Sequence, residues 1–129
     1  MALVKERIGS STIPVLRYKD AAAAIDWLAE SIGFEKRLVV PGEGNTIRHS
    51  QLVFGTGMIM VGSERDGEPA DLGSMYIVVS NVSAHYERAR LAGAEIVIPL
   101  GEQEDRGLFY SCKDPEGRVW NFGQYDPWD

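Results

Sequence analysis

The stretch GFEKRLVVP, residues Gly33 to Pro41, returns later in the chain in shortened form as GAEIVIP, residues Gly93 to Pro99. Each copy has a glycine, one apolar or small residue, a glutamate, a run rich in β-branched residues and a closing proline. The two glycines lie about sixty residues apart, close to half of the 129-residue chain, and such spacing indicates an internal repeat. The sequence therefore predicts two copies of one structural unit.

A helix is predicted immediately before each copy of this stretch. The first segment, DAAAAIDWLAESIG, begins with a good N-cap residue, Asp20, and the second, NVSAHYERARLAG, begins with Asn81. Apolar side chains recur at helical spacing in the first segment, and a glycine that favours a helix end closes both. We therefore expect helices over residues 20–33 and 81–93.

Short β-prone runs fill the rest of each half. One run precedes each helix, at residues 13–18 and 75–79. Three more follow each helix, at 37–40, 47–54 and 58–62 and at 96–98, 108–112 and 118–123. The order is βαβββ twice, which predicts an α+β fold. We expect a single domain, residues 1–129, with module one at about 11–63, a polar linker at about 64–73 and module two at about 74–126.

The composition argues against several classes of protein. Acidic residues outnumber Lys and Arg by 19 to 13, the formal net charge is −6, and the basic residues form no cluster of the kind that binds nucleic acid. No segment has the pattern of a signal peptide or a membrane span. The single cysteine, Cys112, rules out a disulfide within the chain and suits the cytoplasm. We expect a cytoplasmic protein without nucleic-acid or membrane partners.

The stretch DPEGRVWNFGQYDPW, residues 114–128, is a tight turn followed by a strand. Together with PVLRYKDAAAAIDWLAESIGFE, residues 14–35, and the two matched modules, it resembles the vicinal oxygen chelate superfamily of glyoxalases, bleomycin-resistance proteins and extradiol dioxygenases. The resemblance extends from about residue 13 to about residue 125. It implies a curved mixed sheet that forms a cup, and homodimers that associate through the sheets.

The resemblance also implies where a divalent metal would bind, because enzymes of this superfamily take ligands from four strands. In this chain those positions hold Ile13, Met60 (within a residue or so), Ser74 and Asn121. Isoleucine has no donor atom, and a thioether or a neutral amide suits a hard cation poorly. We therefore expect no metal and no other cofactor. The helical histidine, His85, is expected at the helix edge or in solvent.

Strand parity separates the cup from the core, because successive side chains on a strand point to opposite faces. This parity turns Trp120 toward a helix. On the opposite parity we predict the ligand-binding residues, which are Arg17, His49, Gln51, Met60, Ser74, Tyr76, Phe109 and Asn121. The parity of the strand that holds Phe109 is ambiguous, so its neighbour Tyr110 is an equal candidate. His49 and Gln51 face either the cup or solvent.

A cup lined by methionine, tyrosine and valine with a few polar tips is typical of a small-molecule site. We therefore predict a metal-independent protein that holds an amphipathic or aromatic ligand, resembling drug-sequestering proteins of the bleomycin-resistance type. The alternative is a glyoxalase-like lyase or isomerase, or a dioxygenase, which needs a His or Glu at the centre of the cup. A third possibility is a dimeric scaffold whose strands only pack against a partner subunit.

Overall fold

The computed structural model describes residues 9–10, 13–65, 73–104 and 107–126. Its elements follow the predicted order, βαβββ twice, which confirms the α+β fold. Module one contains β1 (Val15–Tyr18), α1 (Ala21–Trp27), the π-helix η1 (Leu28–Ile32), β2 (Glu35–Pro41), β3 (Ile47–Phe54) and β4 (Gly57–Ser63). Module two contains β5 (Met75–Val78), α2 (Val82–Leu91), β6 (Glu95–Gln103), β7 (Gly107–Lys113) and β8 (Val119–Gly123).

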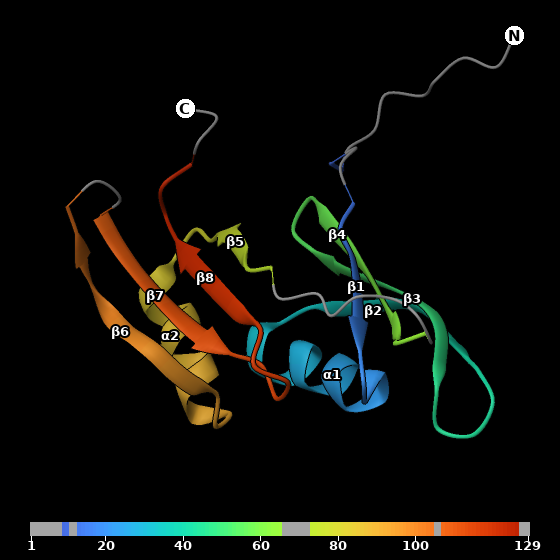
Figure 1. Cartoon of the computed structure of the whole chain (residues 1–129). Helices are drawn as coiled ribbons and strands as arrows, with labels where there is room; N and C mark the ends of the chain where they lie inside the picture. The colour runs from blue at the N-terminus through green and yellow to red at the C-terminus, as the bar shows by residue number, and fades with distance from the viewer. Residues whose placement is uncertain (1–8, 11–12, 66–72, 105–106, 127–129) are drawn as a thin grey trace, which may run out of the picture.

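Each module builds one four-stranded mixed sheet. The strand order is β1-β4-β3-β2 in module one and β5-β8-β7-β6 in module two. The first strand of each module runs parallel to the last, so that Val15 pairs with Met60 and Tyr76 pairs with Asn121. The remaining pairings are antiparallel. Figure 1 shows the two sheets on opposite sides of the molecule, and the sequence repeat is therefore a repeat of topology.

Both helices begin where their capping residues predict. Oδ1 of Asp20 accepts a hydrogen bond from the backbone N–H of Ala23, and Oδ1 of Asn81 accepts one from that of Ala84, each at 3.0 Å. The first helical segment widens into η1 and ends at Gly33, whose φ of 103° a residue with a side chain would adopt only under strain. No helix in the described part of the chain is long and apolar enough to cross a membrane.

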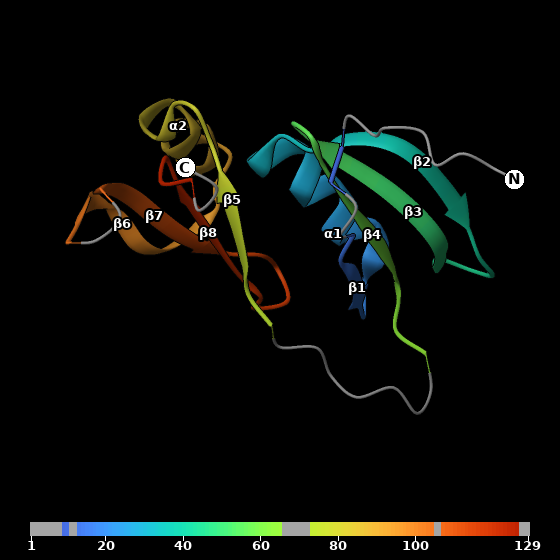
Figure 2. The same ribbon diagram turned by 90° about the horizontal axis from the view of Figure 1, so that it is seen from above.

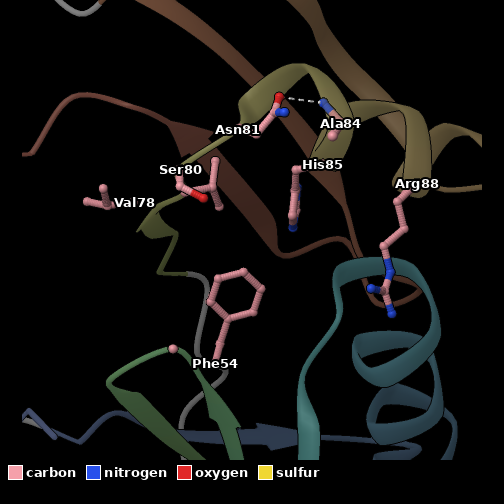
Figure 3. Close-up of a pocket in the computed structure, with 9 residues that line it drawn as sticks. Phe54, Val78, Ser80, Asn81, Ala84, His85 and Arg88 are labelled. Atoms are coloured by element: carbon pink, nitrogen blue, oxygen red, sulfur yellow. Dashed lines mark hydrogen bonds between the residues drawn. The ribbon is translucent and has the colours of Figure 1, made fainter. Parts of the chain in front are cut away.

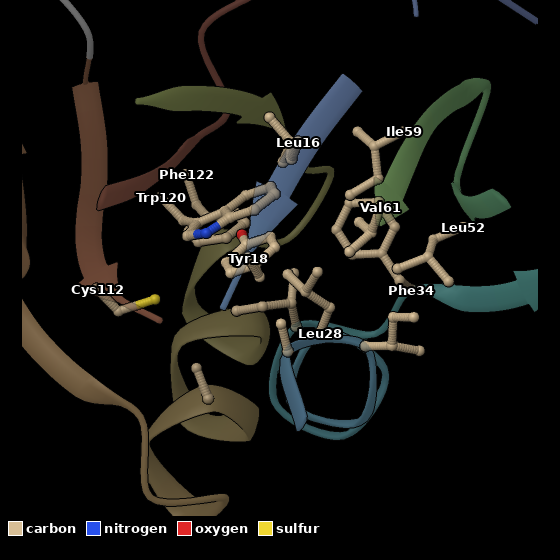
Figure 4. Packing of buried hydrophobic residues seen from close by; sticks show 14 of the residues in the cluster. Leu16, Tyr18, Leu28, Phe34, Leu52, Ile59, Val61, Cys112, Trp120 and Phe122 are labelled. Carbon is tan, nitrogen blue, oxygen red and sulfur yellow. The ribbon is translucent and has the colours of Figure 1, made fainter. Parts of the chain in front are cut away.

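The helices pack on one face of each sheet, and the side chains between them form a core that both modules share. Seen from above, α1 accompanies the module-one sheet and α2 accompanies the module-two sheet (Figure 2). Trp120 and Phe122 are fully buried, and for Trp120 this confirms the position that strand parity predicts. Figure 4 shows them in one cluster with Leu16, Tyr18 and Leu28 of module one. Each such side chain stabilises the fold by roughly 1.5–3 kcal/mol, so separating the modules would expose a large part of the core.

The turn at residues 114–117 fastens module two to module one. The carboxylate of Glu116 accepts hydrogen bonds from the backbone N–H groups of Lys19 and Asp20, each at 2.7 Å. These two donors lie where the chain leaves β1 and enters α1. The same turn therefore leads into β8 of module two and fixes the start of α1 in module one.

Candidate functional site

The face of the module-one sheet that points away from the helices carries four of the predicted ligand-binding residues. Arg17, His49 and Met60 line a cavity of about 360 Å³ on this face. The guanidinium of Arg17 lies over Gly62, since a Cβ at that glycine would come within 2.5 Å of Nη1. The amide N–H of Gln51 donates to Nε2 of His49 at 3.2 Å. The structure therefore brings these four residues together on β1, β3 and β4.

The corresponding face of module two carries the other predicted residues. The rings of Tyr76 on β5 and Phe109 on β7 are stacked, with 6.5 Å between their centroids and 11° between their planes. The hydroxyl of Tyr76 donates to the carbonyl oxygen of Tyr125 at 2.7 Å. Ser74 is exposed just before β5, and Tyr110 is fully buried on the opposite, core side. Because Phe109 is buried too, Tyr76 is the ring of the pair that a ligand can reach.

Asn121 uses both ends of its amide within the sheet. Its Nδ2 donates to the carbonyl oxygen of Met75, and its Oδ1 accepts from the hydroxyl of Ser111, each at 3.0 Å. An amide held in this way fits a metal ion poorly, and the other three superfamily positions hold an isoleucine, a methionine and a serine. Across the described ranges, no three His, Cys, Asp or Glu side chains gather closely enough to hold a metal ion. These residues therefore do not fit the metal site that the superfamily implies.

The predicted residues thus form two groups, and a larger cavity lies between the modules. This cavity has a volume of about 620 Å³. Tyr76 and Val78 of β5 line it from module two, and Phe54 and Met58 of the β3–β4 hairpin line it from module one. Of the eight predicted ligand-binding residues, all of which the structure describes, Tyr76 alone lines it. Strand parity did not reveal this cavity because it depends on how the two modules pack.

A second cavity, of about 440 Å³, adjoins the first, because Phe54 and Val78 line both. Its other walls come from the start of α2 and the residues before it, including Asn81, His85 and Arg88. Figure 3 shows His85 above Phe54, with Asn81 and Ala84 higher still and Arg88 to one side. These polar residues were not predicted to belong to a site.

His85 is half-buried at this second cavity, which corrects the expectation that it lies at the helix edge or in solvent. Its Nε2 donates to the carbonyl oxygen of Ile32 at 2.9 Å, which leaves Nδ1 to accept from the hydroxyl of Tyr110. Loss of solvent on burial lowers the pKa of His85, so the neutral ring is favoured. Helical periodicity could not predict this position, because the partner carbonyl lies 53 residues away in the chain.

The chain consists of two βαβββ modules, each with an open four-stranded sheet, and cavities lie between the modules. These features define a class of small two-module α+β proteins. A family model described as the Glyoxalase/Bleomycin resistance protein/Dioxygenase superfamily matches residues 10–122, and the chain belongs to this superfamily. The resemblance stated from the sequence is therefore confirmed.

Solved structures and curated proteins give further similarities. TioX from Micromonospora sp. ML1 is 35% identical, with a TM-score of 0.75 over 92% of this chain and 100% of TioX. TnmS3, an antibiotic binding protein from Streptomyces sp. CB03234, has a TM-score of 0.70 over 98% of this chain and 100% of TnmS3, but at 17% identity it shows the fold alone. An uncharacterized protein of Mycobacterium tuberculosis (strain H37Rv) is 28% identical over 122 residues, which cover 86% of this chain and 72% of that protein.

Proposed function

We propose that this protein binds an amphipathic or aromatic small molecule in the cavity between its modules and holds it without making or breaking a bond. The observation that carries this proposal is the cavity of about 620 Å³, whose walls are mainly apolar and include Phe54, Met58 and Tyr76. Small-molecule sites typically have volumes of roughly 300–1,000 Å³ and apolar linings with few polar groups. TnmS3, which shares the fold, is an antibiotic binding protein, and this supports the proposal.

Affinity would come from burial of the ligand against preformed aromatic walls. Phe54 is held in place by Phe34, whose ring centroid lies 5.5 Å away, and by His85, whose ring centroid lies 5.8 Å away. A planar ligand stacked on such a ring gains roughly 0.5–1.5 kcal/mol beyond the burial of its area. Because the wall is already packed, little ordering of side chains would oppose binding.

We also propose that the open sheet faces pair with a second copy of the chain. Val15 and Leu38 on the module-one face are 51% and 42% exposed, and Ile98 on the module-two face is 40% exposed. Exposed apolar side chains on these faces are available for contact with a partner, and members of the superfamily commonly dimerise through these sheets. Native mass spectrometry is expected to show twice the 14.2 kDa chain mass. Leu38→Glu should convert the dimer to monomer, and a monomeric wild type would reject this proposal.

The binding proposal is tested with the neutral aromatic fluorophore N-phenyl-1-naphthylamine. Val78 lines both inter-module cavities and is 41% exposed, so Val78→Trp should fill the space and weaken binding at least about tenfold. Val97 on β6 is equally exposed, at 42%, and outside both linings, so Val97→Trp is the matched control. Absence of binding to the wild type, or equal binding by both variants, would reject the proposal. One transition metal per purified subunit would favour the lyase or dioxygenase alternative.

A further inference from the structure

The two inter-module cavities share Phe54 and Val78, and we treat them as the two ends of one cleft, because these ends adjoin and differ in chemistry. One end is mainly apolar and includes Met58 and Tyr76, with Asp126 as its charged residue. The other end lies at the start of α2 and carries polar side chains, which are Ser80, Asn81, His85 and Arg88 (Figure 3). An amphipathic ligand therefore has one preferred direction in this cleft.

The polar end is positively charged. Arg88 is the single charged residue among the described residues that line it. Its Nη2 donates to the carbonyl oxygen of Ala29 at 3.4 Å, a long hydrogen bond that leaves most of the guanidinium N–H groups for another acceptor. The group is held close to the end of η1, since a Cβ at Gly33 would lie 3.2 Å from its Nη1. Arg88 is thus a solvent-exposed cation whose guanidinium lies at the cavity wall, beside the end of η1.

The neighbouring side chains offer hydrogen-bond donors at this end, and the hydroxyl of Ser80 can both donate and accept. Oδ1 of Asn81 is already engaged by the backbone N–H of Ala84, so its amide N–H₂ group remains for a ligand. Both ring nitrogens of His85 are engaged by Ile32 and Tyr110, so this residue contributes only its ring to the wall. The group that complements this end of the cleft is therefore an acceptor with negative charge.

We propose that the ligand is an amphipathic anion whose carboxylate, sulfonate or phenolate group meets Arg88 while its aromatic body passes Phe54 toward Met58 and Tyr76. This inference rests on the proposed function, because it assigns the chemical class and the direction of a ligand in the same cleft. Hydrogen bonds between a guanidinium and an anion are shorter and stronger than neutral ones, so Arg88 acts as the specificity-determining residue.

Two fluorophores with the same aryl-naphthylamine body test this assignment, namely 8-anilinonaphthalene-1-sulfonate and the neutral N-phenyl-1-naphthylamine. Arg88→Met should weaken binding of the sulfonate about tenfold or more, because a hydrogen bond to a charged group is lost. The same variant should leave the neutral dye within about twofold of wild type, and Arg88→Lys should retain most of the sulfonate affinity. Arg90→Met is the matched control, because Arg90 lies on the same helix, pairs with Glu87 at 2.9 Å and is outside both linings.

The outcomes separate this proposal from the proposed function. If neither dye binds the wild type, small-molecule binding fails and the assignment of an anion fails with it. If both dyes bind but Arg88→Met weakens them equally, or weakens neither, the assignment is overturned while small-molecule binding stands. Urea unfolding of each variant identifies any loss of fold. If Arg88→Met does not fold, Arg88→Gln takes its place and is compared with Arg90→Met at low and high salt. A salt-sensitive sulfonate affinity that Arg88→Gln reduces and Arg90→Met leaves unchanged supports the proposal, and equal behaviour of the two variants rejects it.

Discussion

The hydroxyl of Tyr18 on β1 donates a hydrogen bond to Oδ2 of Asp114 at 2.6 Å, across 96 residues of chain. Oδ2 of Asp114 also accepts from Nε1 of Trp120 at 3.1 Å, and Oδ1 accepts from the backbone N–H of Arg118 at 3.0 Å. Nε of Arg118 lies 4.0 Å from Oδ2. A buried carboxylate needs such partners, so this network ties β1 of module one to the turn that begins β8.

Tyr18→Phe is expected to lower the free energy of unfolding by about 1–3 kcal/mol, because it removes a donor from a buried carboxylate. Urea denaturation followed by fluorescence measures the change. Tyr86→Phe is the matched control, because the half-buried Tyr86 makes no hydrogen bond through its hydroxyl within the described ranges. An equal loss of unfolding free energy in the two variants would show that the Tyr18–Asp114 hydrogen bond adds no stability beyond that of an unpaired tyrosine hydroxyl.

The stability of the fold should fall as the pH falls below about 6.5, because of His85. Burial lowers the pKa of His85 from its ordinary value of 6.5, so the folded chain binds this proton less readily than the unfolded chain. The unfolded state therefore takes up more protons below that pH, and the free energy of unfolding decreases. The decrease begins near pH 6.5 and levels off below the folded-state pKa.

Urea denaturation at several pH values between about 5.5 and 8 measures this dependence, in a range where carboxylates contribute little. His85→Gln should flatten the dependence and be less stable at neutral pH, because it changes the contact with Ile32 and Tyr110. The chain has one other histidine, His49 on β3, so His49→Gln is the comparison. A pH dependence that survives in the His85 variant and disappears in the His49 variant would contradict this assignment.

Local signals in the sequence were sufficient for most of the fold. The repeated Gly–x–Glu stretches, the two N-caps and the alternation on β8 are short-range patterns, and each corresponds to an element in the structure. The strand predicted at residues 96–98 is wrong in length, because β6 runs from Glu95 to Gln103. The repeated stretch closes at Pro99, but pairing with β7 continues beyond it to Gln103, with register shifts between Ile96 and Ile98 and between Ile98 and Gly101.

The site was only partly predictable, because it depends on contacts between the modules. Parity correctly placed Arg17 and Tyr76 away from the helices, since that property is local to a strand. The cleft that joins Phe54 to Arg88 arises where the β3–β4 hairpin lies against α2, and no spacing pattern in the sequence predicts that contact. His85 was misplaced for the same reason.

Cys112 is expected to be unreactive in the folded protein. Burial, and then the nearby Asp114 carboxylate, raise the pKa of its thiol to about 12. At pH 8 only about one thiol in ten thousand would be ionised, and the thiolate is the reactive form. Labelling with 5,5′-dithiobis(2-nitrobenzoate) should therefore be at least about a thousandfold slower in buffer than in denaturing urea. Rapid labelling of the folded protein would mean that β7 opens readily.

Gly62 and Gly123 hold corresponding positions on the last strand of each module, and each lies against a side chain from the parallel neighbour. A Cβ at Gly62 would lie 2.5 Å from Nη1 of Arg17, and a Cβ at Gly123 would lie 2.8 Å from the hydroxyl oxygen of Tyr76. The two glycines differ in how far those neighbours can move. Arg17 ends in a long flexible chain, whereas the Tyr76 ring is stacked on Phe109 and hydrogen-bonded at its hydroxyl.

Gly123→Ala is therefore expected to lower the free energy of unfolding by about 1–3 kcal/mol, because the added methyl group must displace a fixed ring. Gly62→Ala should cost no more than about 0.5 kcal/mol, since Arg17 can move aside. Thermal unfolding of both variants, and of Gly123→Ala combined with Tyr76→Ala, measures the coupling. If the ring is the obstacle, Tyr76→Ala removes most of the cost of Gly123→Ala. An undiminished cost in the double variant would instead place the strain at the carbonyl oxygen of Leu108, which lies 3.4 Å from the same Cβ position.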